Sequence, residues 1–155
     1  ESKTEKNLVP MKGMTVIVKK TTQLIAGIVF LYGIYVIVHG HLSPGGGFAG
    51  GVIIAGSFIL LILANGSEFI NLTREETGTT ITENLAILFV LMISLAGLLL
   101  GARIFFNNWL PAGKVGELIS AGVIPLYNIS VGIEVAASIL TIFLALVIFK
   151  EETTK

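Results

Sequence analysis

The sequence contains no cysteine, and charged residues make up only 13% of its 155 positions. The absence of cysteine excludes disulfide bonds, thiolate catalysis and metal clusters ligated by cysteine. The formal net charge is zero, which gives no electrostatic basis for binding nucleic acid. The two histidines do not combine with carboxylates into a set typical of a transition-metal site. We therefore expect no cofactor and no nucleic-acid partner.

Long apolar segments are abundant instead. Hydrophobic residues make up 54% of the chain, and the mean hydropathy is +0.89. A helix that spans a bilayer needs about 20 mostly apolar residues. Four runs approach or reach this length, at residues 22–38, 48–64, 84–102 and 128–149. The sequence therefore predicts an all-α, multi-pass protein of the cell membrane with four transmembrane helices.

The polar ends of the chain flank a single membrane domain. We expect a polar N-terminal arm over residues 1–20, a four-helix transmembrane domain over 21–150 and a polar C-terminal tail over 151–155. Because the sequence begins without methionine, Met11 or Met14 is a candidate start residue.

The distribution of lysine and arginine predicts the orientation of the chain. Eight of these ten residues lie in the N-terminal segment, in the C-terminal tail and in the connection between the second and third apolar runs. The other two, Arg103 and Lys114, lie in the third connection, which joins the third and fourth runs. Positively charged connections remain on the cytoplasmic side of a membrane. We therefore expect both termini in the cytoplasm and the first connection at the outer face.

The first connection, residues 39–51, contains both histidines (His39 and His41), Pro44 and six of the eighteen glycines. Proline lacks a backbone donor, and each glycine weakens a helix by about 1 kcal/mol relative to alanine. In lipid, non-helical backbone persists only where protein or a water-filled cavity satisfies its polar groups. The sequence predicts a Pro/Gly-rich break here, either as a re-entrant segment or as a tight connection between two helix ends.

Helical spacing places other residues on common faces. Tyr32, Tyr35 and His39 fall on one face of the first span, and we favour aromatic packing over a proton path for them. Gly47 and Gly51 are four residues apart at the start of the second span. Small residues at this spacing let two helices approach closely in a membrane.

The two longer connections are polar. Residues 67–83 read as a loop, with a capping box over residues 80–83 that would start the third span. Trp109 in the third connection suits the membrane interface. Residues 114–124 could form a short interfacial helix.

Glu134 is the ionisable residue that lies well inside an apolar run. Ser130, Glu134, Ser138 and Thr141 share one face of the fourth span. A charged carboxylate at mid-bilayer costs at least about 2.5 kcal/mol. One interpretation is that Glu134 handles a proton or a sodium ion, and the other is a glutamate that is protonated or hydrogen-bonded for assembly alone. We favour the first.

Residues 40–53 read GHLSPGGGFAGGVI, a string that closely resembles the signature of the MnhB/MrpB family, which supplies one subunit of Mrp-type multisubunit sodium/proton antiporters. The same family supplies a subunit to membrane-bound hydrogenases and to related sulfur-reducing complexes. The resemblance in hydropathy extends over residues 14–149. It implies other antiporter subunits as partners, or hydrogenase or sulfur-reductase subunits, with Na⁺ and H⁺ as transported ions and membrane lipid around them.

The resemblance also implies roles for single residues. Pro44 would fix the break, and Phe48 would pack it against a neighbour. Many bacterial members carry an aspartate around Asn128, so this chain departs from their pattern there. Glu134, one and a half turns later, is the candidate replacement for that charge. The departure favours an archaeal or hydrogenase-type complex.

Two functions from different classes follow. The first is a non-catalytic subunit that takes part in ion translocation or its assembly, and the alternative is a purely structural subunit that docks and seals its neighbours without contacting the ion. An independent enzyme is disfavoured, because no catalytic triad, phosphate loop or carboxylate pair can be assembled. The candidates for the ion path or the interface are His39, His41, Pro44, Gly45, Gly46, Gly47, Phe48, Gly51, Asn128, Glu134 and Ser138.

Overall fold

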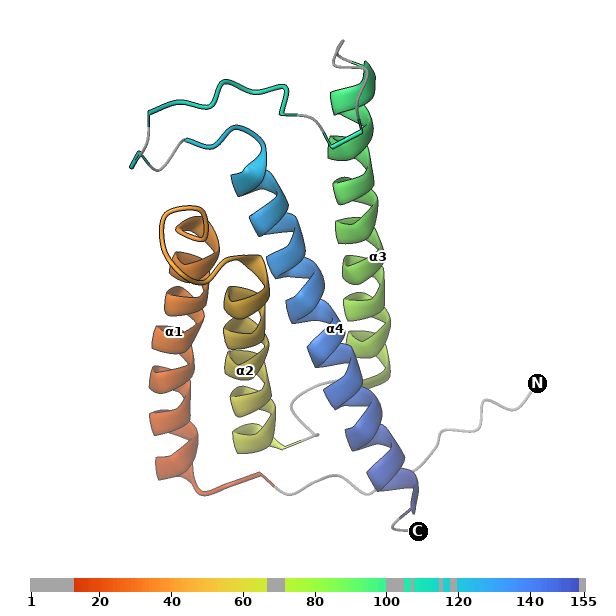
Figure 1. Cartoon of the computed structure of the whole chain (residues 1–155). Coiled ribbons are helices and arrows are strands. Elements are labelled where there is room, and N and C mark those ends of the chain that lie inside the picture. Colours follow the sequence, from red (N-terminus) through yellow and green to blue (C-terminus); the bar gives the residue numbers. More distant parts are fainter. Residues whose placement is uncertain are drawn as a thin grey trace, which may run out of the picture.

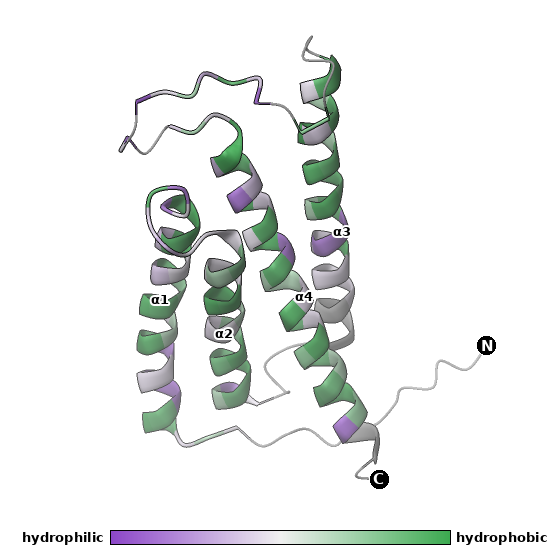
Figure 2. Cartoon of the chain, in the orientation of Figure 1, coloured by the Kyte–Doolittle hydropathy of each residue, from purple (hydrophilic) through white to green (hydrophobic). Residues whose placement is uncertain are grey.

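The computed structural model describes residues 13–66, 72–99, 105–106, 108–114, 116–117 and 120–153. Four α-helices are present there: α1 Val16–Val38, α2 Gly47–Asn65, α3 Leu72–Gly97 and α4 Ile124–Thr153. Each contains a stretch that is long and apolar enough to cross a membrane, and Figure 2 shows that hydrophobic residues cover most of their length. The prediction of an all-α protein with four transmembrane helices is confirmed.

The helix α4 lies between an α1–α2 hairpin and α3 (Figure 1). The hairpin packs on α4 mainly through α2, and α3 packs on the other side of α4. The start of α1, the end of α2, the start of α3 and the end of α4 lie at one end of the bundle. The first and third connections lie at the opposite end, as four successive membrane crossings require.

Two of the helices begin before their apolar runs do. The helix α1 begins six residues before residue 22 and includes Lys19 and Lys20. Lysine stems can lie along apolar surface while their ammonium groups reach water, so these residues do not end a membrane helix. The helix α4 begins four residues before residue 128, with Pro125 in its first turn. Proline is tolerated there because the first N–H groups of a helix have no helical acceptor. The predicted bounds of the second span, 48–64, agree with α2 to within one residue.

The largest error concerns α3, which begins at Leu72, whereas the prediction placed a polar loop over residues 67–83. The proposed capping box at residues 80–83 lies inside this helix. Its threonines do not interrupt the helix, because a hydroxyl can bond within its own turn, as Thr82 Oγ1 does with the Gly78 carbonyl oxygen at 2.9 Å. The part of α3 that is long and apolar enough to cross a membrane is Thr77–Gly97, and Glu83 belongs to it. Residue 102, the predicted end of this span, and residues 1–12 of the predicted arm lie outside the described residues.

The third connection contains turns where a short interfacial helix over residues 114–124 was predicted. Gly113, Gly116 and Gly122 have φ angles of 64°, 94° and 64°. A right-handed helix cannot include residues in this region of backbone space. Among the described residues of this segment, α4 begins only at Ile124, and the prediction of a helix before it was wrong.

Candidate functional site

The first connection is a tight link between two helix ends, not a re-entrant segment. The N–H of His39 still bonds the Tyr35 carbonyl oxygen at 3.0 Å, and the His39 carbonyl oxygen then accepts from the N–H groups of Leu42 and Ser43 at 2.9 and 3.0 Å. These turns end α1, and α2 starts at Gly47. The predicted Pro/Gly-rich break is confirmed, and of its two forms the structure has the tight connection.

Gly46 sets the direction in which the chain enters α2. Its φ angle is 101°, a backbone conformation that side chains with a Cβ atom disfavour. Gly45 precedes it, and Pro44 is exposed just before them. Phe48, in the first turn of α2, is 68% exposed. Its ring is therefore accessible to a neighbouring subunit. That Phe48 packs the break against such a neighbour stays a prediction.

The aromatic residues of α1 form one row that ends at the connection. The rings of Tyr32 and Tyr35 stack with centroids 6.3 Å apart, and those of Tyr35 and His39 stack at 4.1 Å. His39 Nδ1 lies 3.0 Å from the Tyr35 carbonyl oxygen. These contacts hold His39 by packing within its own helix.

Glycines let α2 approach both of its neighbours to within backbone contact. A Cβ atom at Gly51 would lie 2.6 Å from the Gly132 carbonyl oxygen of α4, and one at Gly47 would fall on the Asn128 carbonyl oxygen. On the α1 side, a Cβ at Gly50 would lie 2.8 Å from the Gly33 carbonyl oxygen. Close approach at Gly47 and Gly51 agrees with the predicted packing face. The Gly33–Gly50 contact was missed, because the sequence does not show which helices face each other.

Asn128 connects α4 to the first connection. A Cβ at Gly40 would lie 2.9 Å from its Nδ2, and one at Gly46 would lie 3.5 Å from its Oδ1. Within the described residues, Asn128 Nδ2 and both ring nitrogens of His41 are buried without a hydrogen-bond partner. An unpaired buried polar group costs about 1–3 kcal/mol. Such groups normally bond ordered water or another chain. The first connection and Asn128 therefore form one polar junction at this end of the bundle.

Two side-chain hydrogen bonds fix the contact between α3 and α4, which we call the α3–α4 seam. Ser94 Oγ and Tyr127 Oη are 3.1 Å apart near one end. Thr141 Oγ1 donates to Thr79 Oγ1 at 2.7 Å near the other. Glu134 lies seven residues from both Tyr127 and Thr141 on α4. Seven residues are close to two helical turns, so Glu134 points toward α3 between these two bonds. It is half-buried there.

Glu83 is a second carboxylate in the seam, and the sequence prediction missed it by placing it in a loop. It follows Thr79 by one turn, faces α4 and is half-buried. Since Thr79 lies level with Thr141 in an antiparallel pair, Glu83 lies about one turn, or roughly 5 Å along the axis, from Glu134. Ser138, four residues after Glu134, is also half-buried. The spacing of Thr79, Glu83 and Ala86 at 3.6-residue periodicity was the signal that could have identified this helix face.

The seam carries no positive charge of its own within the membrane. In the membrane-spanning stretches Thr77–Gly97 and Ile124–Lys150, the sequence has one basic residue, Lys150 at the far end of α4. Glu83 and Glu134 therefore cannot be neutralised by lysine or arginine from these two stretches. Carboxylates within a membrane are costly, and they usually face a partner, a water-filled cavity or an ion pathway.

Comparisons with known proteins agree with this architecture. Residues 17–141 match the model of a family described as a domain related to the MnhB subunit of Na⁺/H⁺ antiporter. An uncharacterized protein of Methanocaldococcus jannaschii is 39% identical over 116 residues. A Staphylococcus epidermidis protein assigned as antiporter subunit mnhB2 is 44% identical over 54 residues, which are 35% of this chain. A chain in the structure of the membrane-bound sulfane sulfur reductase, an archaeal respiratory membrane complex, is 29% identical and superimposes with a TM-score of 0.70 over 88% of this chain.

The Methanocaldococcus protein and the reductase chain are longer than this chain. The alignment with the Methanocaldococcus protein covers 70% of this chain and 43% of that protein. The corresponding share is 38% for the Staphylococcus protein and 61% for the reductase chain. The likeness to the Methanocaldococcus protein and to the reductase chain covers most of this chain but less than two thirds of either relative. The likeness to the Staphylococcus protein covers little more than a third of each chain.

Proposed function

Because the chain belongs to the family of domains related to the MnhB subunit of Na⁺/H⁺ antiporters, we propose that it is a non-catalytic membrane subunit of a sodium/proton antiporter module. The observation that carries this proposal is the family match over residues 17–141, which includes the polar junction and almost the whole α3–α4 seam. An antiporter subunit needs ionisable groups within the membrane, and the seam supplies Glu83 and Glu134.

Other membrane subunits are the proposed partners. In each membrane-spanning stretch, only 17–39% of the residues are buried inside the chain. The remaining surface must face lipid or other subunits. Phe48, exposed beside the polar junction, is a group that a neighbour would meet there. The unpaired nitrogens of His41 and Asn128 are buried behind the surface of the chain. We assign this junction to the outer face and both termini to the cytoplasm, on the basis of the lysine and arginine distribution.

Glu134 is the proposed ion-handling residue. Its position between two hydrogen-bonded helices holds the carboxylate about 15 Å along α4 from Ile124, close to the middle of the span. Intramembrane carboxylates typically mark proton or ion pathways. Glu83, one turn away, and the Ser138 hydroxyl add oxygen atoms that suit a proton or a sodium ion.

The likeness to a sulfane sulfur reductase chain supports a respiratory complex as the setting of this module. In that case the redox cofactors would belong to partner chains, since this chain has no cysteine to hold an iron–sulfur cluster. This subunit would then help to couple the energy of electron transfer to ion movement.

A second candidate function is a purely structural subunit, and the glycine contacts favour it. The interfaces of α2 with α1 and with α4 are both built from close backbone approach, a device for tight packing that requires no ion. On this account Glu134 serves assembly, and its replacement by glutamine would leave transport intact.

Purification from native membranes in mild detergent tests the proposal. We expect this chain to be recovered with several other membrane subunits, which are identified by mass spectrometry. A set of antiporter subunits alone would identify a stand-alone exchanger, whereas cysteine-rich partner chains would identify a hydrogenase or sulfur reductase. Recovery of this chain alone, folded and monodisperse, would contradict the proposed function.

A further inference from the structure

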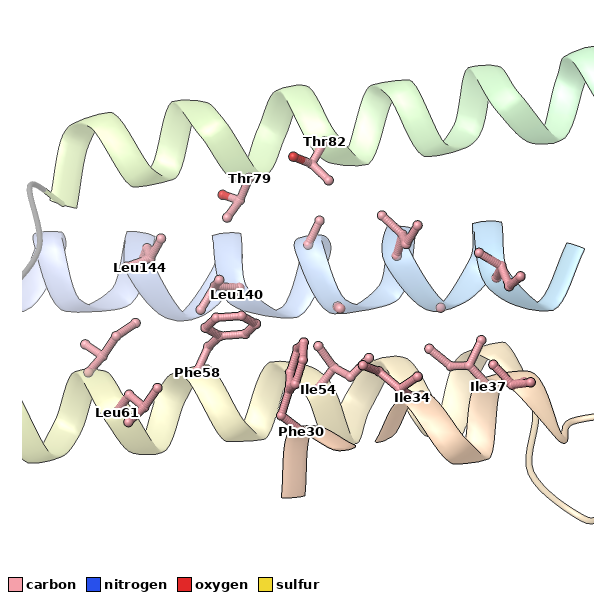
Figure 3. Close-up of a pocket in the computed structure, with 17 residues that line it drawn as sticks. Phe30, Ile34, Ile37, Ile54, Phe58, Leu61, Thr79, Thr82, Leu140 and Leu144 are labelled. Atoms are coloured by element: carbon pink, nitrogen blue, oxygen red, sulfur yellow. The ribbon is translucent and has the colours of Figure 1, made fainter. Parts of the chain in front are cut away.

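A wide groove opens between the α1–α2 hairpin and α3, with α4 as its floor. We propose that this groove seats an apolar transmembrane helix of a partner subunit, an inference that rests on the multisubunit function proposed above. Figure 3 shows Phe30, Ile34 and Phe58 of the hairpin on one side of α4 and Thr79 and Thr82 of α3 on the other. The cavity volume is about 930 Å³.

The length of the groove matches a stretch of helix. Its floor runs along α4 from Ile129 to Leu144, a distance of about 22 Å at 1.5 Å per residue. A helix of about 15 residues could lie along the whole of this floor.

The position of the groove in the membrane favours a helix over a lipid. The middle of the floor, near Ala136 and Ala137, coincides with the middle of the membrane-spanning stretch Ile124–Lys150. The groove therefore continues across the midplane into both leaflets. The hydrocarbon core is about 30 Å thick, so the chains of one lipid end near its middle, about 15 Å from the surface. A single transmembrane helix can follow the whole groove.

The lining predicts the chemistry of the helix that binds. The hydroxyls on the α3 wall are already bonded, since Thr79 accepts from Thr141 at 2.7 Å and Thr82 donates to the Gly78 carbonyl oxygen at 2.9 Å. The partner helix therefore needs no polar side chain at this surface. The floor contains the small residues Gly132, Ala136 and Ala137, which leave space for bulky aliphatic side chains of the incoming helix.

Cross-linking from the floor of the groove tests this proposal in the intact complex. Ile133 lines the groove and is 46% exposed, and Ile142 on the same helix is 61% exposed and lies outside it. Because the chain has no cysteine, Ile133→Cys and Ile142→Cys each give it one thiol for a benzophenone maleimide label. We expect irradiation of native membranes to join position 133 to one apolar transmembrane peptide of a partner subunit. A label at position 142 should instead join to a different subunit or to lipid.

A steric pair of variants provides a second measurement. Ile133→Trp should reduce recovery of the partner subunit at least tenfold, whereas Ile142→Trp should leave it unchanged. Adducts with lipid alone, with a second copy of this chain, or no adduct at position 133 would overturn the inference. If the full set of partner chains still co-purifies, such results leave the proposed function standing. If no partner chain co-purifies at all, the result contradicts the proposed function, and with it the inference that depends on it.

Discussion

Replacing Gly51 by leucine is expected to prevent assembly of this subunit with its partners. A Cβ atom at this position would lie 2.6 Å from the Gly132 carbonyl oxygen and 2.9 Å from the Val135 Cβ. The first of these atoms belongs to the backbone of α4, so the two helices must separate to admit any side chain. Overpacking costs about 1–3 kcal/mol even where side chains can adjust. We expect at least a tenfold loss in the yield of assembled complex, measured by detergent purification.

Gly56→Leu is the matched control for this variant. Gly56 lies five residues further along α2, and a Cβ atom there would meet no atom within 4 Å. The change of residue and the loss of backbone freedom are the same in both variants. We therefore expect Gly56→Leu to assemble like the unmodified chain. Equal yields of assembled complex from the two variants would show that close packing of α2 on α4 is not required for assembly.

Replacing Glu134 by glutamine is expected to reduce sodium-driven proton movement at least tenfold while the complex remains assembled. Glutamine has nearly the same size as glutamate, so it preserves the packing of the α3–α4 seam, yet it can neither lose a proton nor neutralise a sodium ion. A tenfold loss corresponds to about 1.4 kcal/mol in the barrier. The rate is measured in membrane vesicles, and the subunit composition of the same vesicles is checked by mass spectrometry.

The control for Glu134 is Glu117→Gln. Glu117 lies exposed in the third connection, outside the membrane-spanning stretches, and we expect its replacement to leave transport unchanged. Normal transport by the Glu134→Gln complex would favour the structural alternative, in which the seam serves assembly alone. Loss of subunits from that complex would assign Glu134 to assembly as well.

Hydropathy and one motif were enough to predict most of this fold. The four apolar runs correspond to four helices because a membrane leaves helices as the available conformation for a single spanning segment. The glycine-rich break was predictable because Pro44 and the glycines after it remove helix stability locally. Its form was not predictable, since a re-entrant segment and a tight connection have the same local chemistry.

The residues that the sequence did not reveal depend on contacts between helices. Glu83 was assigned to a loop because its threonine-rich surroundings are polar, yet the hydroxyls bond within their own helix and α3 continues through them. The approach of Asn128 to Gly40 and Gly46 joins segments more than 80 residues apart. Such pairings follow from the order in which helices pack, which local patterns do not encode.

Sodium-driven proton movement is the measurement that tests the central claim most directly. Inverted membrane vesicles are prepared from cells that lack this chain and from the same cells with the chain restored, and the proton gradient is followed by a fluorescent dye. If the chain is an antiporter subunit, a pulse of sodium collapses the gradient only in the restored vesicles. An equal collapse in both preparations, with the partner subunits present in each, would contradict the account.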